Sequence, residues 1–147
     1  MNSSKVFLAQ TDTTVGFLSS NDKKLSLIKQ RDTNQKTLQV VDSFKTLKQF
    51  VRVPKKFRNK VRKSKKTTFI YPNALGFRVI DSSSSHHNFI KKSNFLYSTS
   101  ANLTKQSFNE EFAVNSADVI VYTKQNFSSM NSSLIYKVNG RKLKRIR

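Results

Sequence analysis

Three short stretches of this chain carry the kinds of side chain that a nucleotide site requires. Residues 11–16 (TDTTVG) supply hydroxyl groups and a carboxylate, Lys29 and Arg31 are two cations flanking Gln30, and residues 98–102 (STSAN) supply further hydroxyls and an amide. Cations neutralise phosphates, and small hydroxyl or amide side chains make close polar contacts with a ligand. If the fold gathers the three stretches, they predict a nucleotide-binding site.

Each stretch also has an ordinary structural interpretation. Residues 11–16 follow a strand-like run, and α/β folds place ligands at strand ends, but Asp and Gly are equally typical of a simple turn. Lys29 and Arg31 share a side if the chain is extended there, so that both reach one triphosphate; alternatively they stabilise a helix C-terminus. Ser100 and Asn102 can touch a ligand while capping the next helix, or can cap it alone.

Composition limits the classes of protein to be considered. The 147 residues are enough for one domain, residues 1–147, and the 36% of hydrophobic residues, twelve of them Phe, can form one core. The absence of cysteine excludes disulfides and thiolate zinc sites. No apolar run approaches the ~20 residues of a membrane helix, and the N-terminal apolar run is too short for a secretory signal. We therefore expect a soluble cytoplasmic protein without membrane contacts.

Positive charge is both large and unevenly placed. Lys and Arg number 28 against 8 acidic residues, for a net charge of +20, and no acidic residue lies between Asp42 and Asp81 or after Asp118. Residues 55–66 contain eight cations and residues 141–147 contain five. Such a surface favours a polyanion, which can be a polyphosphate nucleotide, tRNA or ribosomal RNA. A solvated basic face without a specific partner is the alternative.

The first half of the chain alternates short strands and helices. Residues 5–9 predict a buried strand that ends at the Thr/Asp cluster, and residues 20–22 cap a helix that ends at Lys29. Residues 37–41 are rich in β-formers. A second helix begins after Ser43 and ends before Pro54, because the residue before a proline is disfavoured in the helical conformation.

The second half continues this alternation. Residues 67–71 and 75–80 predict a hairpin, residues 82–85 begin a short helix, residues 95–97 form a strand, and residues 103–113 form a helix. A strand over residues 118–122 precedes a last hairpin, residues 134–138 and 142–146, which turns at Asn139-Gly140 with positive φ angles. The mixture predicts an α/β (α+β) fold: one domain with a twisted, mixed parallel and antiparallel sheet and flanking helices.

In their order and spacing, the three stretches resemble the YrdC family of threonylcarbamoyl-adenylate synthases. Residues 10–17 (QTDTTVGF) match the family's Pro-Thr-Asp-Thr-Val-Tyr-Gly-Leu with Thr11 and Thr13 in place. The family's Lys-x-Arg and Ser-x-Asn motifs match residues 29–31 and 100–102. The resemblance runs from residue 5 to about residue 140, and residues 132–135 resemble a segment that closes over the family's site. It implies a YrdC-like fold.

The resemblance also implies an activity and a set of roles. Members are nucleotidyltransferases that make threonylcarbamoyl-AMP and pyrophosphate from L-threonine, bicarbonate and ATP, with Mg²⁺ brought by the nucleotide. The product serves the threonylcarbamoyladenosine modification of tRNA through downstream transferase machinery. By position, phosphate binding and catalysis fall to Lys29 and Arg31, nucleotide contacts to Ser100 and Asn102, and the framing of threonine and bicarbonate to Thr11, Thr13, Thr68 and Arg78.

Departures from the family pattern leave other interpretations open. The family's Pro-Gly-Pro loop is replaced by residues 64–66 (SKK), without the glycine whose backbone can approach a ligand closely, so loss of activity is one interpretation. A non-catalytic module that binds double-stranded RNA or tRNA on the same fold is a second, and a family paralogue with another substrate is a third. A protein metal site is not expected, because His86 and His87 would point to opposite faces of a strand.

Overall fold

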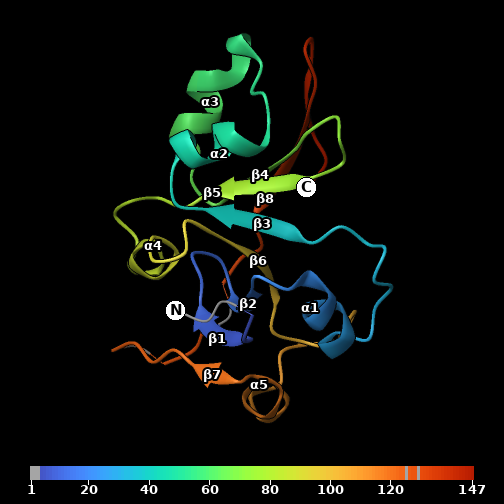
Figure 1. Cartoon of the computed structure of the whole chain (residues 1–147), viewed down its shortest axis with the longest axis vertical. Helices are drawn as coiled ribbons and strands as arrows, with labels where there is room; N and C mark the ends of the chain where they lie inside the picture. Colours follow the sequence, from blue (N-terminus) through green and yellow to red (C-terminus); the bar gives the residue numbers. More distant parts are fainter. Residues whose placement is uncertain (1–3, 125, 129) are drawn as a thin grey trace.

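Nine strands form a single mixed sheet (Figure 1). The computed structural model describes residues 4–124, 126–128 and 130–147. Within them the strand order is β7-β1-β2-β6-β3-β5-β4-β8-β9. Helices α2 and α3 lie at one end of the molecule, and β7 and α5 lie at the other (Figure 1). The strands are β1 Phe7–Gln10, β2 Val15–Ser19, β3 Leu38–Val41, β4 Thr67–Ile70, β5 Gly76–Val79, β6 Phe95–Ser100, β7 Val119–Ile120, β8 Leu134–Val138 and β9 Leu143–Arg145.

The sheet combines both strand orientations, as predicted. The pairs β1–β7, β3–β5 and β4–β8 are parallel, and the remaining neighbours are antiparallel. Tight turns join the antiparallel pairs β4–β5 and β8–β9. Between β3 and its parallel neighbour β5, the chain runs through α2, η1, α3 and β4. The predicted fold class is confirmed.

The helices are short and depend on the sheet for stability. At seven residues or fewer each, they would be marginal in isolation. The predicted caps are confirmed: the side chain of Asn21 accepts from the backbone N–H of Lys24, and that of Ser43 accepts from Thr46. No helix within the described ranges is long and apolar enough to cross a membrane. The helices are α1 Asp22–Ile28, α2 Phe44–Phe50, the 3-10 turn η1 Lys55–Phe57, α3 Arg58–Lys63, α4 Ser85–Ile90 and α5 Glu110–Ser116.

Apolar side chains cover both faces of the sheet. On β3, Val40 and Val41 are both fully buried and point to opposite faces. Val40 belongs to the cluster of Ile90 on α4, and Val41 belongs to the cluster of Leu47 on α2. The sheet is therefore a central layer rather than a half-exposed surface.

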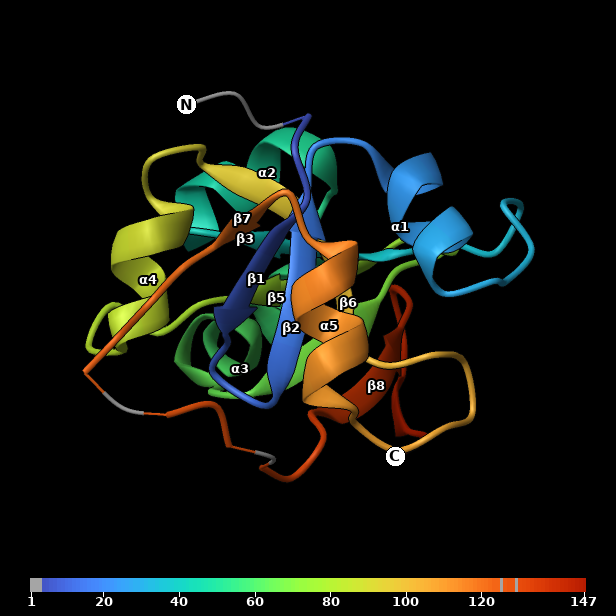
Figure 2. The ribbon, with the colours of Figure 1, turned by 90° about the horizontal axis from the view of Figure 1, so that it is seen from below.

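The β1–β2 end of the sheet is closed by α1 and α5. Leu8 and Phe17, which face each other across the two strands, pack with Leu25 of α1 and Ala113 of α5. Figure 2 shows α5 lying across β1 and β2, with α1 and α4 on either side of the strands. The opposite side chains of the same strands, such as Phe7, pack toward α4.

Two elements are missing from the expectations drawn from the sequence. Strand β2 begins at Val15, inside the hydroxyl-rich stretch that was interpreted as a turn. Helix α3 lies in the basic run of residues 55–66, where Val61 is its only buried residue. In both cases the apolar residues are too few among polar neighbours to give a clear helix or strand pattern, and packing against distant segments determines the structure.

Helix α5 and the histidine pair also differ from expectation. The predicted helix over residues 103–113 is wrong in its first half, because Lys105 adopts a left-handed conformation (φ +64°) and the helix begins only after its cap, Asn109. His86 and His87 lie on helix α4 and not on a strand. The ring of His86 is buried, whereas that of His87 is partly exposed.

The last hairpin is confirmed, but its turn is not built as predicted. All three glycines are in the described part of the chain, and none has a positive φ. The side-chain oxygen of Asn139 accepts hydrogen bonds from the backbone N–H groups of Arg141 (2.8 Å) and Lys142 (2.7 Å). The asparagine, rather than Gly140, therefore shapes this turn.

Candidate functional site

One cavity of about 300 Å³ collects residues from six strands and their loops. It lies on the sheet face of Arg78, and its polar lining is rich in hydroxyl groups and cations. Six of the eight residues singled out in the sequence line it: Thr11, Thr13, Arg31, Thr68, Arg78 and Ser100. The other two, Lys29 and Asn102, do not.

Strand register explains how distant residues reach the same cavity. Gly16 pairs with Ser100, Val40 pairs with Arg78, and Thr68 pairs with Ile135. Side chains alternate along a strand, and paired residues on neighbouring strands point to the same face. The strand register therefore brings residues from distant parts of the chain to one surface.

Gly16 of β2 lines this cavity at a point of close packing. A Cβ atom at this position would lie 2.8 Å from Cγ2 of Thr11 and 3.1 Å from the backbone oxygen of Thr99. These distances are too short for a side chain at position 16 unless the Thr11 side chain and the backbone of β6 move away. The glycine of the TDTTVG stretch thus serves close packing under the site, and its φ is not positive.

Thr11 shapes the loop between β1 and β2. Its hydroxyl donates to the backbone oxygen of Thr14 at 2.5 Å and accepts from the backbone N–H groups of Thr13 and Thr14, both at 3.2 Å. The Thr13 hydroxyl lies 3.3 Å from it. Thr11 is therefore occupied with its own loop, and Thr13 has more hydrogen-bonding capacity left for a ligand.

Lys29 bonds directly to the residues it was expected to face across a cavity. Its Nζ donates to the backbone oxygens of Ser100 (2.9 Å) and Asn102 (2.7 Å) and to both of their side chains. Lys29 is only 5% exposed, and burial, with a smaller contribution from Arg31, lowers its pKa to about 8. The lysine holds the loop after β6 and does not line the cavity.

The helix end explains why Lys29 and Arg31 separate. The backbone N–H of Gln30 bonds to Leu27 and that of Arg31 bonds to Ser26, the pattern of a Schellman cap. Gln30 occupies its left-handed position (φ +53°), where glycine is usual. Of the two interpretations of this segment, the structure therefore shows the helix C-terminus and not the extended segment with both cations on one side.

Arg31 reaches the cavity. Its guanidinium donates to the hydroxyl of Thr37 at 2.8 Å, and its Nε is buried without a hydrogen-bond partner among the described residues. Burial lowers the pKa of this guanidinium. An unmet donor beside a polar cavity is suited to an anionic ligand, because an unpaired buried donor is costly.

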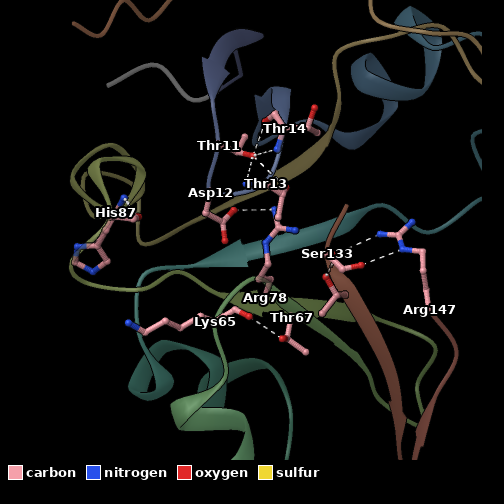
Figure 3. A network of polar contacts seen from close by, with 12 residues as sticks. Thr11, Asp12, Thr13, Thr14, Lys65, Thr67, Arg78, His87, Ser133 and Arg147 are labelled. Carbon is pink, nitrogen blue, oxygen red and sulfur yellow. Dashed lines mark hydrogen bonds and ion pairs between the residues drawn. The ribbon is translucent and has the colours of Figure 1, made fainter. Parts of the chain in front are cut away.

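Arg78 is fixed by a buried ion pair with Asp12 (Figure 3). The two side chains approach to 3.2 Å, although Oδ1 of Asp12 lacks the alignment of a hydrogen bond, and Nε of Arg78 has no partner in the described structure. Burial lowers the pKa of Arg78 and raises that of Asp12, and their mutual attraction opposes both shifts. Sequence reasoning identified Arg78 but did not identify its partner.

Ser133 and Arg147, which flank the C-terminal hairpin, also line the cavity. The hydroxyls of Thr68 and Ser133 share a hydrogen bond of 3.2 Å, and the guanidinium of Arg147 donates to Ser133 at 3.0 and 3.2 Å. Figure 3 shows Arg147 and Ser133 together at the side of the site away from Asp12. Residues 132–135 were matched to a closing segment, whereas Arg147 and Lys36, which also lines the cavity, were missed as site residues.

Comparisons with known proteins give matches in structure only. No protein-family model and no curated protein matches the chain. E. coli YciO superposes with a TM-score of 0.73 at 15% identity over 97% of this chain and 82% of YciO. P. abyssi Sua5 complexed with L-threonine superposes with a TM-score of 0.74 at 12% identity, over 97% of this chain and 50% of the Sua5 chain. Full-length HypF in its phosphate- and nucleotide-bound form superposes with a TM-score of 0.75 at 14% identity, over 98% of this chain and 27% of the HypF chain.

These three structures contain YrdC-like domains. The chain has the YrdC-like fold. The fold that the motifs predicted is therefore confirmed. Identities this low establish the fold and not the activity, because one fold carries many functions. The YrdC-like chain also spans only half of the Sua5 chain and about a quarter of HypF.

The YrdC-like chain offers little for a metal ion in its described residues. They contain no group of three His, Cys, Asp or Glu side chains able to hold one. Asp12, which lies in the chain between the lining residues Thr11 and Thr13, is paired with Arg78. His86 is buried, and neither of its ring nitrogens has a partner within the part of the chain that the structure describes. Burial, with smaller effects of Arg78 and His87, lowers its pKa to about 3.

Proposed function

We propose that this YrdC-like chain forms threonylcarbamoyl-AMP and pyrophosphate from L-threonine, bicarbonate and ATP. One observation carries the proposal: six of the eight residues selected by the family motifs, drawn from positions 11 to 100, line the same cavity. The similarity to Sua5 complexed with L-threonine and to nucleotide-bound HypF supports it at the level of the fold. The product is then the substrate of a tRNA threonylcarbamoyl transferase.

Arg31, Lys36 and Arg147 are suited to the triphosphate. All three line the cavity, and no acidic residue is among the residues that line it. Nε of Arg31 has no acceptor among the residues that the structure describes, and the Arg147 fork is already oriented by Ser133. Preorganised cations stabilise the charge that develops on a leaving pyrophosphate without having to reorganise during the reaction.

Arg78 and the hydroxyls of Thr13 and Thr68 are suited to the small substrates. The planar fork of an arginine binds a carboxylate or carbamate, and Asp12 holds this fork in place. Thr68 offers a hydroxyl already ordered by Ser133. These groups orient the carbamate toward the phosphates held by Arg31.

The reaction requires no covalent bond to the protein. Bicarbonate takes up a proton and loses water to give CO₂. The threonine amine then adds to the carbon of CO₂ and gives up a proton, which yields the carbamate. A carbamate oxygen then attacks the α-phosphorus of ATP, and the bond to the bridging oxygen breaks with release of pyrophosphate. The protein contributes alignment and charge neutralisation.

Lys29 and Asn102 act as positioning residues in this scheme. The Lys29 ammonium ties the loop of residues 100–102 to the end of α1, next to Arg31. Because Ser100 lines the cavity, this tie sets where its hydroxyl lies. Mg²⁺ arrives with the nucleotide as part of the substrate, since no carboxylate among the described residues lines the cavity.

Pyrophosphate release by the purified chain tests the proposal. ATP and Mg²⁺ are supplied with and without threonine and bicarbonate, and threonylcarbamoyl-AMP is measured by mass spectrometry. The proposal expects pyrophosphate and threonylcarbamoyl-AMP in equal amounts, and only when both co-substrates are present. Release that needs neither would identify a paralogue with another substrate. No release, with salt-dependent retention of tRNA, would support the RNA-binding alternative.

A further inference from the structure

A second, larger cavity lies away from the first, beside α2 and α3. Figure 1 shows these two helices at one end of the molecule. The volume of this cavity is about 610 Å³. It lies between the end of α2, the segment leading into α3, the β4–β5 turn and the β8–β9 turn. It shares no lining residue with the first cavity, so the proposed synthase chemistry leaves it unexplained.

Aromatic and proline rings form its apolar wall. Phe50, Tyr71, Pro54 and Pro72 line it, and Phe50 is 38% exposed while packing edge-on against Phe95. Tyr71 is 3% exposed, and its hydroxyl is buried without a hydrogen-bond partner among the described residues. A buried hydroxyl without a partner is unfavourable unless a ligand satisfies it. The wall thus combines flat apolar surface with one unmet polar group.

Cations without counter-ions surround the opening. Arg52, Lys55 and Arg58 line the cavity and are exposed, and in the described residues none of them forms an ion pair. No acidic residue lines the cavity. Arg58 is partly ordered, because its Nε donates to the backbone oxygen of Val53 at 3.3 Å. This arrangement favours a ligand that carries both an aromatic ring and negative charge.

The positive surface continues beyond the cavity. Nζ of Lys56 donates to the backbone oxygen of Arg141 at 3.3 Å, and Nζ of Lys60 lies 5.3 Å from the ring centre of Tyr136. The basic run of residues 55–66 is therefore joined to the basic β8–β9 hairpin. A free nucleotide would leave most of this charge unused, whereas a strand would place successive phosphates along it.

We infer that this second cavity binds an unpaired nucleotide of an RNA strand. The base lies against the exposed ring of Phe50, and the Tyr71 hydroxyl bonds to the edge of the base. Arg52, Lys55 and Arg58 hold the flanking phosphates. RNA is the chosen partner because its loops, bulges and ends expose unstacked bases, whereas a duplex keeps its bases stacked. The inference does not depend on the synthase activity.

Fluorescence anisotropy with the full chain tests the site. The probes are a labelled single-stranded RNA of about eight nucleotides, an abasic strand of equal length and a blunt RNA duplex. We expect the single strand to bind at least about tenfold more tightly than the abasic strand, because stacking on aromatic rings accounts for that much. Ultraviolet cross-linking should attach the RNA at Phe50 or Tyr71.

Two double variants with equal loss of charge provide the matched control. Arg52→Ala with Lys55→Ala should reduce the slope of log affinity against log salt by about 1.4, as expected for two lost phosphate contacts on a single strand. Lys91→Ala with Lys92→Ala, at the exposed end of α4, should change the affinity little. Tyr71→Phe should weaken the binding of the single strand by about threefold or more. It should not lower the melting temperature, because the hydroxyl it removes is buried without a partner among the described residues.

Several results would overturn the inference. Equal losses in the two double variants would mean that only net charge matters. Equal binding of the abasic strand or of the duplex would mean that no base enters the cavity. Cross-links only outside the second cavity would place the RNA elsewhere. Pyrophosphate release serves as the separate readout: it should survive the Arg52/Lys55 change, because neither residue lines the first cavity.

Discussion

Nζ of Lys29 lies 2.7 Å from the backbone oxygen of Asn102, although the two residues are 73 positions apart. This contact joins the end of α1 to the loop after β6, and Nζ also bonds to Ser100. One buried ammonium therefore orders a loop that lines the candidate site. It also explains why Arg31, and not Lys29, is the cation of this pair that remains available to a ligand.

Replacing Lys29 should change both stability and its pH dependence. Lys29→Met leaves two buried carbonyl oxygens without their donor, so we expect a loss of about 1–3 kcal/mol at neutral pH. Because burial lowers the pKa of Lys29 to about 8, the unfolded chain binds more protons between there and the usual value of 10.5. Stability contributed by Lys29 should therefore rise with pH in this window. Urea unfolding at several pH values measures this; parallel curves for both proteins would contradict it.

Replacing Gln30, the left-handed residue between Lys29 and Arg31, by glycine should stabilise the folded protein. Gln30→Gly removes the Cβ from a position with φ +53°, so we expect a gain of about 1 kcal/mol and a melting temperature higher by a few degrees. Gln49→Gly, at an exposed position inside α2, is the matched control and should lose about 1 kcal/mol. A loss in both variants would show that Gln30 makes a contact that outweighs its strain.

The buried ion pair should be far more costly to break than to remove. Asp12→Asn leaves the Arg78 guanidinium buried and unpaired, so we expect a loss of about 3–5 kcal/mol. Combining it with Arg78→Met should recover much of this loss, although threonine-dependent turnover should not return. A double-mutant cycle from urea unfolding measures the coupling, and additive losses would mean that the two side chains do not stabilise each other.

The close approach at Gly16 predicts a rescue experiment. Gly16→Ala places a methyl group 2.8 Å from Cγ2 of Thr11, and we expect a loss of about 1–3 kcal/mol. Thr11→Ser removes Cγ2 while keeping the hydroxyl, so the double variant should regain part of the loss. Thermal melts compare the three proteins. If Thr11→Ser gives no recovery, the strain lies with the backbone oxygen of Thr99 instead.

Replacing Arg31 should lower the rate of reaction with ATP more than it lowers the stability of the fold. Arg31→Ala removes a cation from the cavity, and we expect kcat/KM for ATP to fall by about 10²- to 10³-fold in the pyrophosphate assay. Lys91→Ala, which removes the same charge from the exposed end of α4, should leave the rate unchanged. Equal effects of the two changes would assign the loss to overall charge, and near-normal turnover of Arg31→Ala would remove Arg31 from the site.

Local signals made much of the fold predictable. The strands near residues 7, 38, 67 and 76 and the caps Asn21 and Ser43 follow from apolar runs and from side chains that bond to the backbone a few residues away. Strand β2 and helix α3 were missed because their polar neighbours dominate the pattern. Their structure depends on pairing with β6 and on the burial of Val61, which are contacts between distant segments.

The sequence by itself determined the residue types available to the site: hydroxyls after two strands, a Lys-x-Arg pair, and an excess of cations with few carboxylates. Only the tertiary structure decided how each is used. Lys29 is saturated by Ser100 and Asn102, Asp12 holds Arg78, and Arg147 joins the cavity from the last hairpin. The physical reason is that burial and sheet register, which no local pattern contains, determine which charges meet a partner inside the protein and which remain free for a ligand.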